Sequence, residues 1–257
     1  MSITKHELPI LEYDSSPSAV IQPDHERHLL SLRLPERAVF AFLGEAVDDY
    51  AKAHGAKIAG KFVSITKEYP VYTTEADGKQ IALVQAPVGA PAAVQILDWL
   101  IAYGARKIIS CGSCGVLEKF DENRFLIPSR ALRDEGTSYH YLPPDRYVEI
   151  PETARAAIRK ALKNRGLPFT EVTTWTTDGF FRETKEMVAY RKEEGCAAVE
   201  MECAALAACA HFRGATFGEL LYTADTLADV ERYDERDWGA DSINVALELC
   251  IEAVKEL

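Results

Sequence analysis

The sequence predicts a single three-layer α/β domain, in which helices cover both faces of a sheet. Short apolar runs typical of strands alternate along the chain with segments in which apolar residues recur at helical spacing. The 257 residues contain no linker-like change of composition, internal repeat or low-complexity tract, which favours one large domain over two small ones.

The first 36 residues precede this alternation. They are polar and carry several prolines, which is typical of an extended arm. We therefore expect an N-terminal arm over residues 1–36, laid over the body or over a neighbouring subunit, and the α/β domain over residues 37–257.

Apolar runs that stop at turn-forming residues define the expected strands. Gly44 ends the first run, Pro87 ends the second, and a loop over Gly112–Gly115 interrupts the third. Ligand sites in open α/β sheets lie beyond the carboxyl ends of strands, so the residues that follow these runs are candidates for a site. In chain order the runs are Ala38–Leu43, Ile81–Ala86, Lys107–Ser110, Phe125–Leu132, Val172–Thr176, Ala197–Val199 and Phe217–Ala224.

Four helices are expected between and after these strands. In the first, apolar residues recur at helical spacing until Gly104. The second opens at Pro151, which suits a first helical turn, and closes at Gly166. The last two cover the alanine-rich segment Cys203–Phe212 and the amphipathic segment Ser242–Glu256.

Composition narrows the function classes. With 29 basic and 40 acidic residues the net charge is −11, which disfavours binding to nucleic-acid backbones and to anionic membranes. No run approaches the roughly 18 apolar residues of a membrane-spanning helix. The N-terminus has no apolar signal-peptide core, and the cysteines lie mostly inside apolar runs, so a cytoplasmic location is the expectation.

The segment Cys111-Gly112-Ser113-Cys114 has the C-x-x-C spacing of a redox pair. Redox chemistry is disfavoured because no clear helix follows to lower the thiol pKa. A second interpretation is that the glycines and Ser113 hold an oxygen-rich group, although a plain turn explains the segment equally well. The sequence offers no second C-x-x-C, no H-x₃-H and no nucleotide-binding glycine motif, so we expect no metal and no cofactor.

Two carboxylates, Glu200 and Glu202, flank Met201 where a strand-like run gives way to a helix. An ionised carboxylate in an apolar neighbourhood is costly unless it is paired, which suits a site that holds a polyhydroxy ligand. The alternative is that both are solvated acids of a first helical turn, favoured by the helix dipole.

Taken together, these segments resemble the nucleoside phosphorylase family, which covers purine nucleoside and uridine phosphorylases and the related nucleosidases. The resemblance spans roughly residues 37–257 and implies that family's fold, with a mixed central sheet. Seven elements carry it in the family's order: Leu43-Gly44-Glu45, Val88-Gly89-Ala90-Pro91, Gly104-Ala105 with Ile108–Gly115, Arg133–Ser138, Thr177–Phe181, Val199–Glu202 and Thr223-Ala224-Asp225.

The resemblance implies roles for the sugar and the base. Glu202 matches the carboxylate that grips the ribose hydroxyls, with Glu200 beside it, and Met201 matches the apolar contact under the sugar. Phe180 matches the aromatic residue that stacks on the base. Asp225 matches the acid that donates a proton to the leaving base in purine-specific members; a helix N-cap is its structural alternative.

The base is expected to be a purine. Pyrimidine-specific relatives read uracil with a Gln and an Arg after the stacking Phe, and Thr184 and Glu186 occupy these places here.

The phosphate side departs from the family. Gly44 and Ser113 are kept, but Asp48 and Ser110 stand where phosphorylases carry arginines, which removes two bidentate anion contacts. Lys67 matches a cation that a neighbouring subunit contributes.

Another residue of the first loop, Asp49, lies near the place where related nucleosidases hold an acid that activates water. For Asp48 and Asp49 a solvated helix start is an equally good interpretation.

The sequence thus predicts cleavage of the N-glycosidic bond of a nucleoside. The first expectation is phosphorolysis, which uses phosphate as co-substrate at an atypical phosphate site and gives free base and pentose 1-phosphate. Hydrolysis is the alternative, and a non-catalytic nucleoside-binding relative is the third. The resemblance also implies a homodimer or hexamer, in which His25 of the arm reaches a partner's sugar site.

Overall fold

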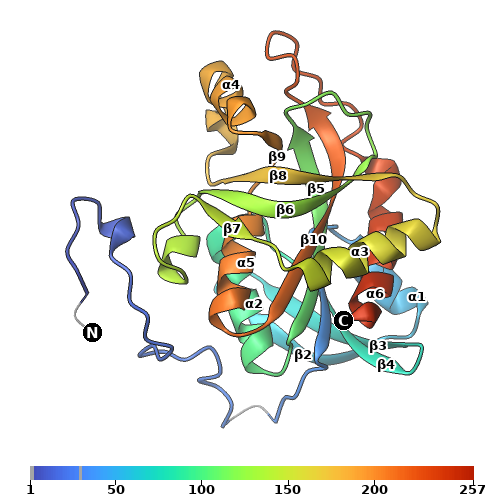
Figure 1. Cartoon of the computed structure of the whole chain (residues 1–257). Coiled ribbons are helices and arrows are strands. Elements are labelled where there is room, and N and C mark those ends of the chain that lie inside the picture. Colours follow the sequence, from blue (N-terminus) through green and yellow to red (C-terminus); the bar gives the residue numbers. More distant parts are fainter. Residues whose placement is uncertain (1–2, 29–30) are drawn as a thin grey trace.

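The computed structural model describes residues 3–28 and 31–257 and contains one mixed sheet of ten strands with helices on both sides (Figure 1). This confirms the predicted fold class. The strands are β1 (Arg37–Ala41), β2 (Lys57–Val63), β3 (Glu68–Ala76), β4 (Lys79–Gln85), β5 (Lys107–Val116), β6 (Phe125–Asp134), β7 (Tyr147–Glu149), β8 (Phe169–Thr177), β9 (Cys196–Glu200) and β10 (Thr216–Thr226).

The helices are α1 (Ala46–Ala53), α2 (Ala90–Ala102), α3 (Glu152–Asn164), α4 (Lys185–Glu193), α5 (Cys203–Phe212) and α6 (Ile243–Glu256). Short 3₁₀ turns are η1 (Pro9–Leu11), η2 (Ser138–His140), η3 (Phe180–Arg182) and η4 (Ala240–Ser242).

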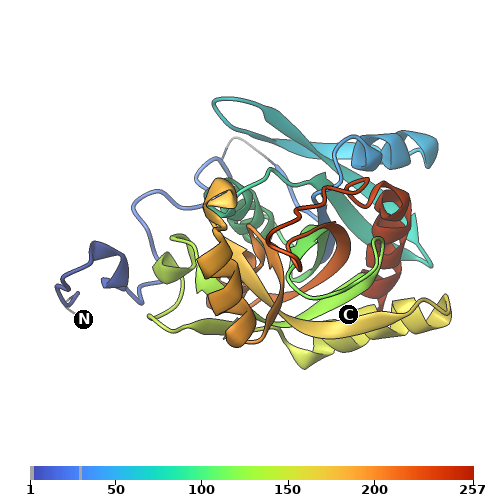
Figure 2. The same cartoon turned by 90° about the horizontal axis from the view of Figure 1, so that it is seen from above.

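The sheet closes on itself over half of its width. Its order is β10-β6-β8-β9-β5-β1-β4-β3-β2, and β10 also pairs with β5, which joins β5, β10, β6, β8 and β9 into a ring. The view from above shows this curled part beside the open extension made by β1 to β4 (Figure 2). The ring brings the ends of β5, β8, β9 and β10 close together.

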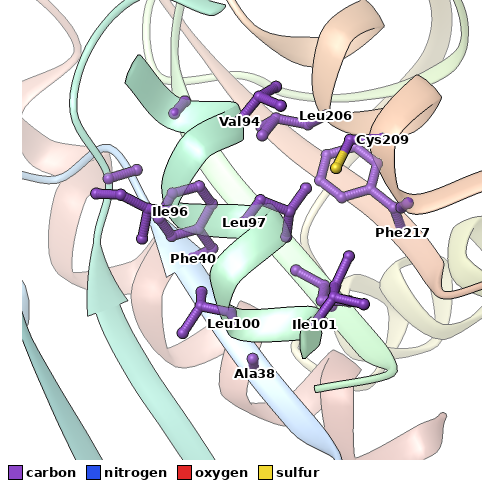
Figure 3. Packing of buried hydrophobic residues seen from close by; sticks show 14 of the residues in the cluster. Ala38, Phe40, Val94, Ile96, Leu97, Leu100, Ile101, Leu206, Cys209 and Phe217 are labelled. Carbon is purple, nitrogen blue, oxygen red and sulfur yellow. The ribbon is translucent and has the colours of Figure 1, made fainter. Parts of the chain in front are cut away.

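Strand alternation sends successive side chains to two separate cores. Ala38 and Phe40 of β1 face the helices α2 and α5, whereas Val39 and Ala41 face α3 and α6. Figure 3 shows the first core, where Leu97 of α2 lies beside Phe40. Burial on both faces explains why β1 reads as a continuous apolar run rather than as an alternating one.

Three parts of the fold differ from the expectations or add to them. Gly112–Gly115 was expected to be a loop but continues β5, because β10 pairs along its length and Gly115 pairs with Val199 of β9. The helix α4 and the strands β2, β3 and β7 were not anticipated, and α1 was anticipated only as the helix start that was one interpretation of Asp48 and Asp49. The side chains of β2 are largely exposed and those of β3 are mostly half-buried, so the apolar pattern that marks a buried strand is weak there.

The described part of the N-terminal arm lies against the ends of α2 and α5 (Figure 1). Arg27 donates to the carbonyl oxygen of Ala102 over 2.7 Å, and Arg213 donates to that of Pro17 over 2.8 Å. Arg213 also forms a bidentate pair with Asp98, so the arm is tied to a buried ion pair of the body.

Within the described residues, no helix is both long enough and apolar enough to cross a membrane.

Candidate functional site

A cavity of about 170 Å³ lies where β5, β9 and β10 converge. It is lined from β5 by Gly112–Gly115, from β9 and the start of α5 by Val199–Glu202, and from β10 by Glu219, Leu221 and Asp225. Phe42, Val88, Phe180, Glu183 and Trp238 complete the lining. The structure thus brings Ser113, Phe180, Glu200, Met201, Glu202 and Asp225 of the predicted site together.

Glu200 is buried and its carboxylate is fully engaged with the protein. One oxygen accepts hydrogen bonds from the hydroxyls of Thr174 at 3.2 Å and Thr176 at 2.7 Å. The other accepts from the backbone N–H groups of Glu202 at 2.7 Å and Cys203 at 2.6 Å. These N–H groups belong to the start of α5, so Glu200 caps this helix and fixes the direction of the residues between β9 and α5.

Glu202 has most of its hydrogen-bonding capacity free. It is only 7% exposed, and one carboxylate oxygen accepts from the backbone N–H of Gly89 at 2.5 Å. Burial, and then the neighbouring charge of Glu200, raise the pKa of Glu202 to about 8. A carboxyl group with an open oxygen at the wall of a cavity can form hydrogen bonds with ligand hydroxyl groups, as a donor when it is protonated and as an acceptor in either form.

Asp225 faces the cavity from the end of β10 and is 5% exposed. Burial raises its pKa, while a hydrogen bond from the Tyr233 side chain opposes this shift. Gly115 makes room for it: a Cβ there would lie 3.3 Å from an Asp225 carboxylate oxygen and 3.0 Å from Val199 and Leu227 side-chain atoms. The alternative that Asp225 caps the N-terminus of a helix is wrong, because Asp225 lies within β10 and no helix follows directly.

An aromatic residue and an acid flank Asp225 on the outer side. Phe180 of η3 is 42% exposed and packs edge-on against Phe181, with ring centroids 4.9 Å apart. Glu183 lines the same cavity, and burial followed by the charge of Asp225 raises its pKa to about 7. Sequence reasoning missed Glu183, although it lies only three residues after Phe180.

The two positions that the sequence comparison singled out for base recognition do not line this cavity. The hydroxyl of Thr184 accepts from the backbone N–H of Met187 and caps α4, and Glu186 is an exposed residue of its first turn. After the turn η3, Glu183 therefore lines the cavity, whereas Thr184 and Glu186 do not.

Another buried acid, Glu219, also lines the cavity. It is 2% exposed, and one oxygen accepts from the Ser110 hydroxyl at 3.3 Å, while the other has no partner in the described structure. Burial and then the charge of Glu200 raise its pKa well above the ordinary value. Ser110 is fully buried and points at this acid, and nothing in the sequence pattern flagged Glu219.

The remaining predicted residues lie outside the cavity lining. Gly44, with φ of 57°, precedes α1, and Asp49 is exposed in its first turn, the solvated helix start that was one of the interpretations. Lys67 lies in the exposed turn between β2 and β3. His25 is exposed in the arm, where its Nδ1 lies 3.0 Å from the carbonyl oxygen of Gln22.

The C-x-x-C segment has the opposite character from a redox pair. Cys111 and Cys114 are buried free thiols of an extended strand, and burial raises the pKa of Cys114 well above its ordinary range. In residues 3–28 and 31–257 no group of three His, Cys, Asp or Glu side chains is arranged to hold a metal ion.

Comparison with known proteins agrees with this geometry. The family model described as the phosphorylase superfamily matches residues 36–255. Guanosine phosphorylase of Halorubrum lacusprofundi is 24% identical over 162 residues, which cover 62% of this chain and 67% of that protein.

Two solved structures share the fold. Uridine phosphorylase of Vibrio fischeri superposes with a TM-score of 0.76 at 18% identity, covering 87% of this chain and 93% of the other. AMP nucleosidase of Bacteroides thetaiotaomicron gives a TM-score of 0.70 at 24% identity, covering 86% and 88%. With a family model that spans nearly its whole length and a cavity at the family's motifs, this chain belongs to the phosphorylase superfamily.

Proposed function

We propose that the protein cleaves the N-glycosidic bond of a purine nucleoside. The observation that carries this proposal is the single cavity that joins Asp225, an acid with a raised pKa, to Glu202 and to the half-exposed ring of Phe180. A purine is favoured because one acid at the base edge suits the ring nitrogen of a leaving purine. The similarity to a guanosine phosphorylase supports the same choice.

Asp225 is the proposed general acid. Departure of the base leaves negative charge on its ring system, and a proton delivered to a ring nitrogen raises the rate by a factor of about 10²–10⁴. The raised pKa keeps this carboxyl protonated to a higher pH than an exposed aspartate, and the Tyr233 side chain holds its orientation.

Glu202 and Met201 are the proposed sugar contacts. The free oxygen of the Glu202 carboxyl group exchanges hydrogen bonds with ribose hydroxyls, which orients the sugar while its glycosidic bond breaks. Glu200 is proposed to act indirectly. All its hydrogen bonds are formed with the protein, and they hold Glu202 in place.

Water is the acceptor that the charges of the cavity favour. Among the described residues, the lining carries five carboxyl groups and no Lys, Arg or His side chain. At the inner end, where the resemblance expects an arginine, the Ser110 hydroxyl donates to Glu219. A dianionic phosphate entering this low-dielectric space would meet acids instead of the guanidinium groups that normally hold it.

Phosphorolysis is the second candidate, and two observations favour it. Ser113 lines the cavity with a hydroxyl that can bind phosphate, and the relative from Halorubrum is a guanosine phosphorylase. This route requires cations that this chain does not place in its own cavity, so a partner subunit would have to supply them. Lys67 on its exposed turn and His25 in the arm remain the proposed contributors, within the predicted homo-oligomer.

The test is a panel of purine and pyrimidine nucleosides incubated with and without inorganic phosphate, with sugar products identified by mass spectrometry. We expect free ribose from purine nucleosides in both buffers, with ¹⁸O incorporated from labelled water. Ribose 1-phosphate formed only with phosphate would replace hydrolysis by phosphorolysis. If no nucleoside is cleaved under either condition, the proposed function is wrong.

A further inference from the structure

A second cavity, of about 480 Å³, adjoins the candidate site on its outer side. We call it the apolar annex. It lies between η3, the start of α4 and the segment that follows β10. Its apolar lining is Phe181, Val188, Leu227, Val230, Tyr233 and Trp238.

The annex and the candidate site form one continuous space. Phe180, Glu183, Asp225 and Trp238 line both cavities, so these side chains form the boundary between them. The two parts differ in chemistry: the inner one is rich in carboxyl groups, whereas the annex is mainly apolar, with Glu183, Lys185, Asp225 and Asp229 as its charged residues. A ligand that fills both therefore has a polar end and an apolar end.

The annex also holds an unusual amount of exposed aromatic surface. Phe181 is 91% exposed, Tyr233 is 55% exposed and Trp238 is 47% exposed. Such a cluster, rimmed by polar groups, marks a binding surface, because each ring gains about 25 cal/mol per Å² when a ligand removes it from water.

We propose that the annex binds an apolar substituent carried by the purine base, and that it makes the protein selective for bases with a bulky aryl or alkyl group. This inference rests on the proposed function. In that arrangement Asp225 donates a proton to a nitrogen of the five-membered ring. The 6-substituent of a purine projects from the neighbouring edge and so passes Asp225 into the annex.

The experiment compares adenosine with N6-benzyladenosine, which differ only by the group that the annex would hold. We expect kcat/KM of the wild-type protein to be at least tenfold higher for the benzyl compound. Phe181→Ser and Val230→Asp should remove this preference and leave kcat/KM for adenosine within about twofold. Tyr190→Ser is the matched control, because Tyr190 is a half-exposed aromatic residue of α4 outside the annex, and it should change neither substrate.

Binding of the free bases separates the two proposals. Calorimetry with adenine and 6-benzylaminopurine needs no turnover, and we expect at least tenfold tighter binding of the benzyl base, lost in Phe181→Ser. If neither nucleoside is cleaved but the benzyl base still binds more tightly, the proposed reaction fails and the annex stands. If adenosine is cleaved while the benzyl compounds are rejected, or if the variants affect both ligands equally, the annex proposal is overturned.

Discussion

Asp225 and Glu202 illustrate how one cavity surrounds two buried carboxyl groups with different neighbours. Both are almost completely buried, and burial is the first cause of the raised pKa in each. Asp225 receives a hydrogen bond from the Tyr233 side chain, whereas Glu202 receives one from the backbone N–H of Gly89. These different neighbours are the reason why we propose Asp225 for proton donation and Glu202 for hydroxyl binding.

Replacing Asp225 by asparagine removes the acid and keeps its shape. We expect kcat for a purine nucleoside to fall by a factor of about 10²–10⁴, with KM changed little, because the proton is needed only in the transition state. Steady-state kinetics measures this split. Asp229→Asn on the exposed margin is the control and should stay within about twofold of wild type; an unchanged kcat in Asp225→Asn would remove Asp225 from the mechanism.

The junction between β9 and α5 depends on a single side chain. Glu200 accepts two hydrogen bonds from hydroxyls of β8 and two from the start of α5, so it joins a strand of the ring to the helix that follows it. Glu202 lies at the start of α5, so its position depends on the capping hydrogen bonds of Glu200 as well as on its own packing.

Truncation by Glu200→Ala leaves these donors without an acceptor in a buried place. We expect the free energy of unfolding to fall by about 3 kcal/mol or more, because each unsatisfied buried group costs about 1–3 kcal/mol. Chemical denaturation monitored by tryptophan fluorescence measures it. Glu186→Ala, an exposed first-turn acid of α4, should stay within about 1 kcal/mol; an equally mild effect in Glu200→Ala would contradict the capping role.

The buried acids of the site also govern how the stability of the whole molecule depends on pH. Glu183 and Glu202 have pKa values of about 7 and about 8 in the folded protein, above their ordinary 4.5. Folding therefore takes up protons between the ordinary and the raised values. The stabilisation is fully present below pH 4.5 and is lost as the pH rises through 7 and 8.

We thus expect the melting temperature to fall as the pH rises from about 6 to about 9, since a tenfold difference in proton affinity between the folded and unfolded protein corresponds to about 1.4 kcal/mol. Glu202→Gln should flatten this fall, as measured by differential scanning calorimetry. Glu171 gives the control of opposite sign, because hydrogen bonds from Arg159 and Arg155 lower its pKa. Glu171→Gln should therefore lower the melting temperature at neutral pH, and this difference from the wild type should disappear in acid. A melting temperature that rises across pH 6–9 would contradict the assignment.

Much of this molecule is determined by local sequence pattern. The apolar runs and helical repeats predicted the layers, because residues 38–41, 97–101 and 203–210 are buried wherever a sheet and its helices pack together. The order of motifs predicted the family and selected Phe180, Met201, Glu202 and Asp225, which line one cavity because each lies at or just after the end of a strand that meets the others.

Two features were decided only by the tertiary structure. One is the buried charge of Glu219 beside Ser110, and the other is the apolar annex beside the candidate site. Glu219 lies in the middle of an apolar strand, and its contact with Ser110 depends on the pairing of β10 with β5, which closes the ring. The annex likewise joins η3 and α4 to the segment after β10, about forty to sixty residues further along the sequence. The periodicity of a sequence indicates which face of a helix or strand is buried, but it does not indicate which distant element packs against that face. Both features depend on contacts of this kind between distant elements.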